Sequence, residues 1–248
     1  MTYIHGYSQA GDELLTVQAE FWKDRLTLPG THLAPGTRLL EVGCGTGSVL
    51  SILDHAFPAL ALSGVDIEPM QVATARERLD RPGIPIDLRV ADARDLPYAN
   101  GTFDHVWIQF LLEHMDAVDA RRTLQEARRV LAPGGRLTAI EFDYHTLRFH
   151  SDLDPLAWDV VRVMNAYGQS DAGSRLRYWL SEGGWSDIDP GPQRFGYQGA
   201  ATPPVAKYFE QALTALMPGT AGIVDLRRMG AKPTDSIEFT VYKATARA

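Results

Sequence analysis

The chain has 248 residues, 45% of them hydrophobic, and a formal net charge of -7. This length suits one globular domain with additions. The acidic balance disfavours nucleic acid as a partner, and no run of about 18 apolar residues predicts a membrane span. The start of the chain lacks a signal-peptide pattern and Cys44 is its single cysteine, so we expect a cytoplasmic protein.

The first predicted element is an amphipathic helix over residues 10–28, which carries apolar residues at helical spacing. The segment LPGTHLAPGT then interrupts the chain. Beyond it, buried strands are predicted over residues 38–42, 60–65, 86–90, 103–109 and 136–142, with helices over 47–57, 69–79 and 119–131. This alternation predicts an α/β fold with a doubly wound, mostly parallel sheet.

After residue 150 the pattern is looser. Helices are predicted over residues 153–167, 174–182, 205–217 and 221–229, and the final SIEFTVYKATA alternates as a strand does. We therefore expect a single domain over residues 1–248. Residues 1–30 would form an N-terminal strap and helix, 37–150 a cofactor-binding core, and 191–234 a helical cover over the substrate site.

The segment LLEVGCGTGSVL joins the first strand to the next helix through glycines at every second position. Ligands of open α/β sheets bind beyond the carboxyl ends of the strands, and glycines let a ligand approach the main chain there. The second strand ends in GVDIEP, where an acid typically accepts hydrogen bonds from ribose hydroxyls. Asp66 is therefore the predicted ribose ligand.

The spacing of these glycines bears on the kind of cofactor. A dinucleotide site has the pattern G-x-G-x-x-G, whereas this chain has G-x-G-x-G with Glu41 just before the first glycine. A carboxylate there would repel a phosphate and suits an amino group. A nucleoside with an amino-acid tail therefore fits better than a dinucleotide, and a nicotinamide-dependent oxidoreductase is disfavoured.

Four segments in this order resemble the motifs of class I S-adenosylmethionine-dependent methyltransferases. They are LLEVGCGTGSVL, GVDIEPMQVATAR, VADARDLPYANGTFDHVWIQFLLEHM and EARRVLAPGGRLTAIEF, which together cover about residues 37–142. The resemblance implies a seven-stranded, Rossmann-like sheet whose last strand is antiparallel and lies between strands five and six. It also implies S-adenosyl-L-methionine as cofactor and S-adenosyl-L-homocysteine as product.

The resemblance further implies roles for individual residues at the cofactor. Glu41 and the Gly43 and Gly45 turn would lie near the methionine amino group, and Asp66 with Ile67 at the ribose. Asp92 and Ala93 would take the adenine edge, and the main chain near Gln109 would border the methionine part. Tyr7, in the leading segment YIHGYS, could bond the methionine carboxylate or pack on the sulfonium.

A cluster of polar residues follows the fifth predicted strand, at the end where a methyl acceptor would lie. If the acceptor must lose a proton, Glu141 or His145 could take it. These residues could instead cap the strand, or bind a metal together with Asp143, although the resemblance requires no metal. His114 is a weaker candidate for the base and is expected to anchor a loop near the cofactor.

The sequence thus predicts an enzyme that methylates an O, N or C atom of a small, partly apolar metabolite, plausibly in natural-product biosynthesis. No basic patch suggests nucleic acid, and the protein is expected to be a monomer or homodimer. Two alternatives remain open at this point: a non-methylating reaction of the same cofactor, such as cyclisation, or a non-catalytic protein that binds it as a ligand.

Overall fold

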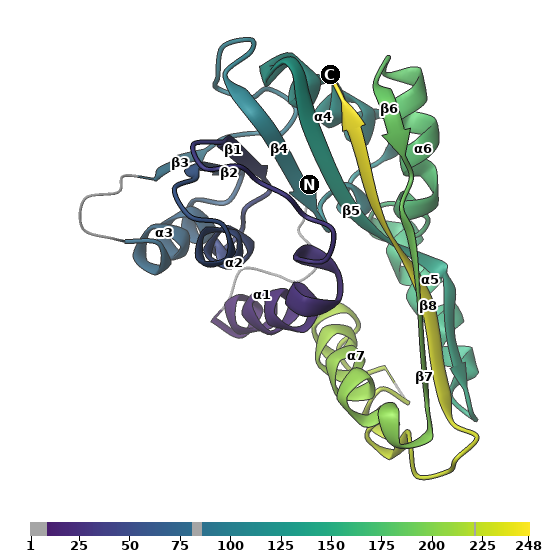
Figure 1. Cartoon of the computed structure of the whole chain (residues 1–248). Coiled ribbons are helices and arrows are strands. Elements are labelled where there is room, and N and C mark those ends of the chain that lie inside the picture. The colour runs from purple at the N-terminus through teal and green to yellow at the C-terminus, as the bar shows by residue number, and fades with distance from the viewer. Residues whose placement is uncertain (1–8, 81–85, 221) are drawn as a thin grey trace.

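The computed structural model describes residues 9–80, 86–220 and 222–248, with side chains from residue 13 onward (Figure 1). Within these ranges no helix has the length and apolar character needed to cross a membrane. Tyr7, predicted at the cofactor, lies outside the described residues.

One mixed sheet of eight strands forms the centre of the molecule, in the order β3-β2-β1-β4-β5-β8-β6 with β7 paired to β8. The strands are β1 (Arg38–Val42), β2 (Ala61–Asp66), β3 (Asp87–Val90), β4 (Phe103–Gln109), β5 (Leu131–His150), β6 (Ser186–Asp189), β7 (Pro192–Gln198) and β8 (Ser236–Arg247). Strands β1 to β5 are parallel. The doubly wound α/β fold is thereby confirmed.

The last strand, β8, pairs antiparallel with β5 on one side and with β6 and β7 on the other. The predicted insertion of an antiparallel final strand between strands five and six is therefore confirmed. The prediction of seven strands is wrong by one, because two short strands share the outer edge of β8. They are separated at Gly191, whose added Cβ would lie 2.0 Å from the Lys243 carbonyl oxygen.

Helices cover both faces of the sheet and pack into two apolar clusters. The helices are α1 (Gln9–Trp22), α2 (Ser48–Ala56), α3 (Pro69–Arg78), α4 (Ala117–Val130), α5 (Asp154–Tyr167), α6 (Ala172–Glu182) and α7 (Pro203–Leu216). Short helical turns are η1 (Lys23–Thr27), η2 (Leu112–His114), η3 (Gly199–Ala201) and η4 (Val224–Arg228). One cluster takes side chains from α2, α3, α5 and α7, and the other from α4 and α6.

The strands β5, β7 and β8 continue beyond the parallel part of the sheet and run beside α7 (Figure 1). The predicted helical cover over 191–234 is therefore corrected: it begins with strand β7, and only α7 and two short turns are helical. Alternating Phe195 and Tyr197 explain this strand, because both pack against the apolar cluster under α7.

Helix α1 is held against α7 by aromatic side chains. The ring of Phe21 stacks on Tyr208 with centroids 4.1 Å apart. The indole Nε1 of Trp22 donates a 3.0 Å hydrogen bond to the Tyr208 hydroxyl. Trp22 is fully buried, so the C-terminal end of α1 is fixed to the second half of the chain.

Candidate active site

The glycine turn after β1 forms one wall of the site. Gly43 has φ of 76°, a conformation that favours glycine. A Cβ at this position would lie 2.9 Å from Cδ1 of Leu111, on the loop after β4. Gly43 is therefore needed both for the backbone conformation and for the close approach of that loop.

Glu41, at the end of β1, is a buried carboxylate beside the turn. Its side chain is 2% exposed, and among the described residues its Oε2 has no hydrogen-bond partner. Burial, together with the nearby Asp66 carboxylate, raises the pKa of Glu41 well above its ordinary value. Such an acceptor is costly unless a donor satisfies it, so this position suits a ligand ammonium group.

Asp66, at the end of β2, faces the same turn. Its carboxylate accepts hydrogen bonds from the backbone N–H groups of Gly45, at 2.9 Å, and Glu68, at 3.0 Å. These bonds orient the side chain, while burial raises its pKa. The next residue, Ile67, is an apolar side chain left 56% exposed.

A cleft lies between this turn and helix α1. It consists of two adjoining cavities of about 110 and 50 Å³. Both cavities share the lining residues Leu15, Gln18, Gly43, Gly45, Gln109 and Phe110. Glu41 lines the smaller cavity, and Asp66 and Ile67 the larger. The structure thus brings together most of the residues predicted at the cofactor.

The far wall of the cleft is the end of β4 and the loop after it. Gln109 is 8% exposed, and its Oε1 accepts a 3.2 Å bond from the indole of Trp107. Phe110 has φ of 54°, an uncommon value for a residue with a side chain. Backbone strain of this kind is found at ligand-binding sites, and Phe110 lines both cavities.

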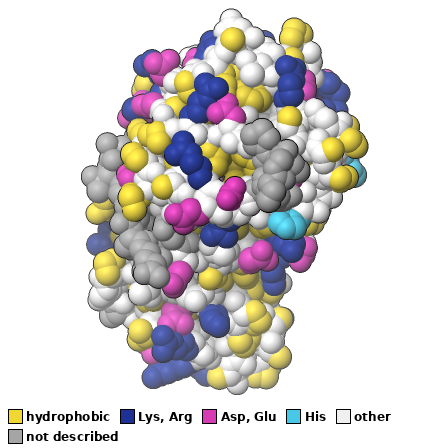
Figure 2. All heavy atoms as spheres, turned by 90° about the vertical axis from the view of Figure 1, so that its left-hand side faces the viewer, with side chains coloured by type: hydrophobic (Ala, Val, Ile, Leu, Met, Phe, Trp, Pro, Cys, Tyr) yellow, Lys and Arg dark blue, Asp and Glu magenta, His cyan; other side chains and the backbone are white. Residues whose placement is uncertain are grey.

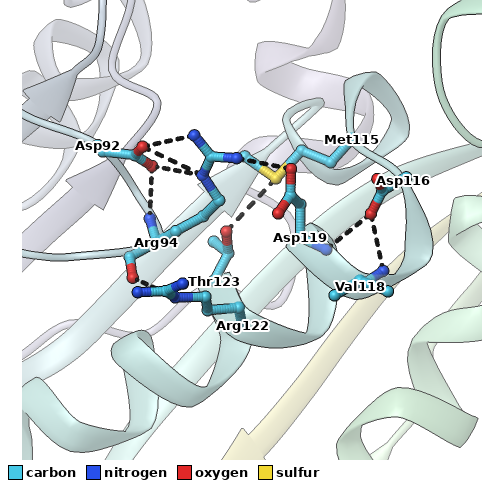
Figure 3. A network of polar contacts seen from close by, with 8 residues as sticks. All are labelled: Asp92, Arg94, Met115, Asp116, Val118, Asp119, Arg122 and Thr123. Carbon is cyan, nitrogen blue, oxygen red and sulfur yellow. Dashed lines mark hydrogen bonds and ion pairs between the residues drawn. The ribbon is translucent and has the colours of Figure 1, made fainter. Parts of the chain in front are cut away.

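Asp92 and Ala93, predicted at the adenine edge, line neither of these two cavities. Figure 3 shows the Asp92 carboxylate turned toward Arg94, whose Nη2 lies 2.6 Å from Oδ2. Arg94 also donates a 2.7 Å bond to Asp119 on α4. The guanidinium hydrogen bonds lower the pKa of Asp92, so this carboxylate is held ionised and oriented.

Glu141, predicted as a proton acceptor, is fully buried in β5. Its Oε1 accepts the N–H groups of Leu111 and Leu112, at 3.1 and 2.8 Å, and its Oε2 that of Glu113, at 3.1 Å. The carboxylate therefore fixes the loop after β4 and lines neither cavity. This geometry does not support Glu141 as a base.

His145, the other predicted base, is exposed at the surface. Its Nε2 lies 2.8 Å from the Ser170 hydroxyl, and it lines neither cavity. Asp143 accepts the His145 backbone N–H at 3.1 Å, so the alternative in which these residues cap the strand end fits better. In the described part of the chain no three His, Cys, Asp or Glu side chains are placed to hold a metal ion.

Several residues of the cleft were not identified from the sequence as functional. Leu15 and Gln18 come from α1, whose apolar spacing predicts only packing. Behind the cleft, Glu113 is a carboxylate that is 2% exposed and lines neither cavity. Its position as an acid inside the apolar run FLLEHM was a signal for it. His114 lines the larger cavity, although it was predicted to anchor a loop and was ranked below Glu141 and His145 as a base.

The chain is similar in sequence to known methyltransferases. Residues 39–135 match a family model described as a methyltransferase domain. The chain is 35% identical over 132 residues to a demethylmenaquinone methyltransferase of Thermus thermophilus, covering 53% of this chain and 59% of that protein. It is 34% identical over 142 residues to 27-O-demethylrifamycin SV methyltransferase of Amycolatopsis mediterranei, covering 56% and 50%. The chain thus spans about half to three fifths of the length of these curated relatives.

Solved structures share the fold at lower identity. A geranyl diphosphate C-methyltransferase of Streptomyces coelicolor, in complex with Mg²⁺, geranyl diphosphate and S-adenosyl-L-homocysteine, superposes with a TM-score of 0.57 at 19% identity, covering 95% of this chain and 80% of that one. A putative methyltransferase of Bacillus halodurans gives a TM-score of 0.58 at 15% identity, covering 89% and 96%. At these identities the likeness establishes the fold.

Proposed function

We propose that this chain is a class I S-adenosylmethionine-dependent methyltransferase, as its likeness to a methyltransferase domain and to curated methyltransferases supports, and that it transfers a methyl group from that cofactor to a small molecule. The observation that carries the proposal is the buried Glu41 carboxylate beside the glycine turn, close to Asp66, with one oxygen that no described residue satisfies. When bound, the cofactor supplies an electrophilic methyl group. The protein's task is then to hold donor and acceptor in line.

The residues present fit such a cofactor. The ligand's ammonium group would satisfy Glu41 Oε2, and the carboxylate would in turn be stabilised in its charged form. Asp66 is oriented by two backbone N–H groups and keeps acceptor capacity for the ribose diol. The side chain of Ile67 is exposed beside it and offers an apolar surface for the base.

Further cofactor contacts are proposed at Asp92, Ala93, Gln109 and Tyr7. We keep Asp92 and Ala93 as the adenine contacts, because Arg94 leaves the Asp92 carboxylate ionised and able to accept a further hydrogen bond. Gln109 borders the cleft at the methionine end. Tyr7 stays a prediction.

The acceptor is proposed to enter from the side closed by α1 and α7. The cavities, of about 110 and 50 Å³, are smaller than the roughly 300–1,000 Å³ of pockets that hold drug-sized ligands. Helix α1 must therefore move outward to admit a nucleoside and an acceptor. The apolar side chains of Leu15, Phe110 and Leu111 on this side favour a partly apolar metabolite over a macromolecule.

Two measurements test the proposal. Calorimetry should detect binding of S-adenosyl-L-methionine, and Asp66→Ala should weaken it roughly tenfold or more, since each bond to a charged acceptor contributes about 1.5–3 kcal/mol. Incubation of a metabolite extract with methyl-labelled cofactor, followed by mass spectrometry, should then reveal a labelled product. Tight binding without any transfer would instead favour a non-methylating or non-catalytic role.

A further inference from the structure

The ionisable side chains of the cleft separate into two groups by position. Among the described residues, Glu41 and Asp66 lie with the buried Cys44 on the side of the glycine turn. His114 lies opposite, in the turn η2 that follows β4, and lines the larger cavity. Since we assign the two carboxylates to the cofactor and Cys44 lies with them, His114 is the ionisable side chain left for the acceptor among the described lining residues.

A buried carboxylate stands behind His114. The imidazole Nε2 lies 3.9 Å from Oε1 of Glu113. That oxygen also accepts a 2.9 Å bond from the Tyr144 hydroxyl, and Oε2 accepts a 3.2 Å bond from the Phe142 N–H. Glu113 is therefore fixed in place from β5. Burial raises the pKa of Glu113 to about 7, and above that pH its carboxylate lies close enough to favour a protonated imidazole.

The charges in the cleft restrict the acceptor. Among the described residues, no Lys or Arg side chain lines either cavity, and residues 1–12 contain neither residue type. Among the described lining residues, the side chain that could compensate a phosphate or carboxylate on the acceptor is His114, which could not then accept a proton. The cleft therefore suits an acceptor that is uncharged at its reacting end.

We propose that His114, supported by Glu113, takes the proton from a neutral, phenol-like or enolic hydroxyl group of the acceptor. This rests on the proposed methyl transfer. As the hydroxyl oxygen gains the methyl group it loses its proton to the imidazole, so the positive charge that the donor loses reappears on His114. A phenol ionises near pH 10 and imidazole near 6.5, close enough for a general base to help, whereas a neutral amine needs no base to attack.

The charged state of His114 can be tested through binding, without the acceptor. A protonated His114 would repel the sulfonium of S-adenosyl-L-methionine but not the neutral thioether of S-adenosyl-L-homocysteine. Among the described residues, the nearby titratable groups include Glu113 on its own turn and Asp66 across the cavity. Glu141 and Tyr144 on β5 interact in turn with Glu113. Their effects must be separated from that of His114 by variants.

Calorimetry from pH 5.5 to 8.5 would measure the dissociation constants of S-adenosyl-L-methionine and S-adenosyl-L-homocysteine, and the ratio of the first to the second. The wild type, His114→Gln and Glu113→Gln would be compared. In the wild type we expect this ratio to rise about tenfold toward low pH, as a unit charge appears beside the sulfonium. In His114→Gln the rise should vanish, and in Glu113→Gln it should shift to lower pH. A rise that persists in His114→Gln belongs to the carboxylates and overturns the proposal.

The result also separates this inference from the proposed function. Binding of both ligands with a ratio that does not change with pH overturns the role of His114 alone, whereas failure of either ligand to bind overturns the methyl transfer and this inference with it. The labelled product of the extract experiment is a second test. An O-methyl group on an uncharged reacting end is expected, and label on an amine nitrogen or beside a phosphate would contradict the acceptor class.

Discussion

Glu41, which we propose contacts the ligand's ammonium group, opposes the stability of the unliganded protein. Burial raises its pKa, so the folded protein keeps the proton at pH values where the unfolded chain has lost it. Between the ordinary glutamate pKa and the raised value, the folded state binds more protons, and this group's contribution to stability falls as pH rises. A ligand ammonium group at Oε2 would remove this penalty.

We therefore predict that Glu41→Gln raises the thermal midpoint of the unliganded protein at pH 7 to 8 and weakens cofactor binding. The gain should be about 2–4 °C for each kcal/mol of relieved penalty, and should shrink toward pH 5, where Glu41 holds its proton. Thermal melts and calorimetry would measure the two effects. Glu20→Gln, at an exposed position of α1, is the control; a lower midpoint with unchanged affinity would contradict the role of Glu41.

The ion pair at Asp92 gives a second prediction at this scale. Arg94→Gln removes the guanidinium that orients Asp92 and links it to Asp119, so cofactor affinity should fall several-fold, and further below pH 5 as Asp92 regains its proton. Arg38→Gln breaks a comparable pair with Asp104 at the other end of β1 and should leave affinity unchanged. Equal affinities for the wild type and Arg94→Gln at every pH would count against Asp92 as an adenine contact.

At the residue scale, the sequence grouped the residues proposed for the cofactor far better than those proposed for the acceptor. Glu41, Gly43, Gly45 and Asp66 belong to one turn and the strand end beside it, so local spacing is enough to group them. Glu141 was assigned from its place after a strand. Its actual partners are backbone N–H groups about thirty positions earlier in the chain, which local spacing does not reveal.

Among the secondary-structure elements, the predicted bounds of a strand agree with the observed ones where hydrophobic periodicity defines the strand. Strand β4 has its predicted bounds of residues 103–109, whereas β5 runs to His150 although it was predicted to end at 142. Its extension pairs with β8 only after an irregularity between Asp143 and Arg148. The extension is stabilised by its long-range antiparallel partner β8, so the local sequence after residue 142 does not predict a strand.

The position of helix α1 depends on a contact from the last strand. The Lys243 amine donates hydrogen bonds of 2.6 to 3.0 Å to the backbone carbonyls of Leu26, Thr27 and Pro29, and lies 2.7 Å from the Thr31 hydroxyl. Replacing it leaves carbonyls at the end of η1 without this donor. Such losses cost about 1–3 kcal/mol each when the groups stay buried.

Lys243→Met should therefore destabilise the protein by roughly 1–3 kcal/mol and also weaken cofactor binding, because α1 supplies Leu15 and Gln18 to the cleft. Urea unfolding and calorimetry would follow the two effects. Lys207→Met, at an exposed position of α7, serves as the matched control. If Lys243→Met lost stability but kept full affinity, the placement of α1 would not depend on this anchor.

On the face of the molecule seen in Figure 2, charged side chains are dispersed and do not form one cluster. Acidic and basic side chains are interspersed with apolar ones on the face seen in Figure 2, and no single large patch of either sign forms there. The net charge of -7 therefore does not produce one extended acidic surface on this face. Recognition is expected to depend on the cleft, where Glu41 and Asp66 concentrate negative charge.

The cleft also joins distant parts of the chain, which leads to a prediction for global stability. Its walls come from α1, the turn after β1, the end of β2 and the loop after β4, while β8 fixes η1 through Lys243 and β5 fixes the β4 loop through Glu141. A ligand that contacts all these walls should stabilise the molecule as one unit. At one hundred times its dissociation constant, S-adenosyl-L-homocysteine should contribute about 2.7 kcal/mol.

This corresponds to a rise of about 5–11 °C in the thermal midpoint, at 2–4 °C for each kcal/mol. Scanning calorimetry should show one transition that moves to higher temperature as a whole. Asp66→Ala should lose most of the shift while keeping a single transition, since its effect is on binding and not on cooperativity. Two separate transitions, of which the ligand moves only one, would mean that the β7–α7 half unfolds independently of the cofactor core and that the contacts of Lys243 and Tyr208 do not couple them.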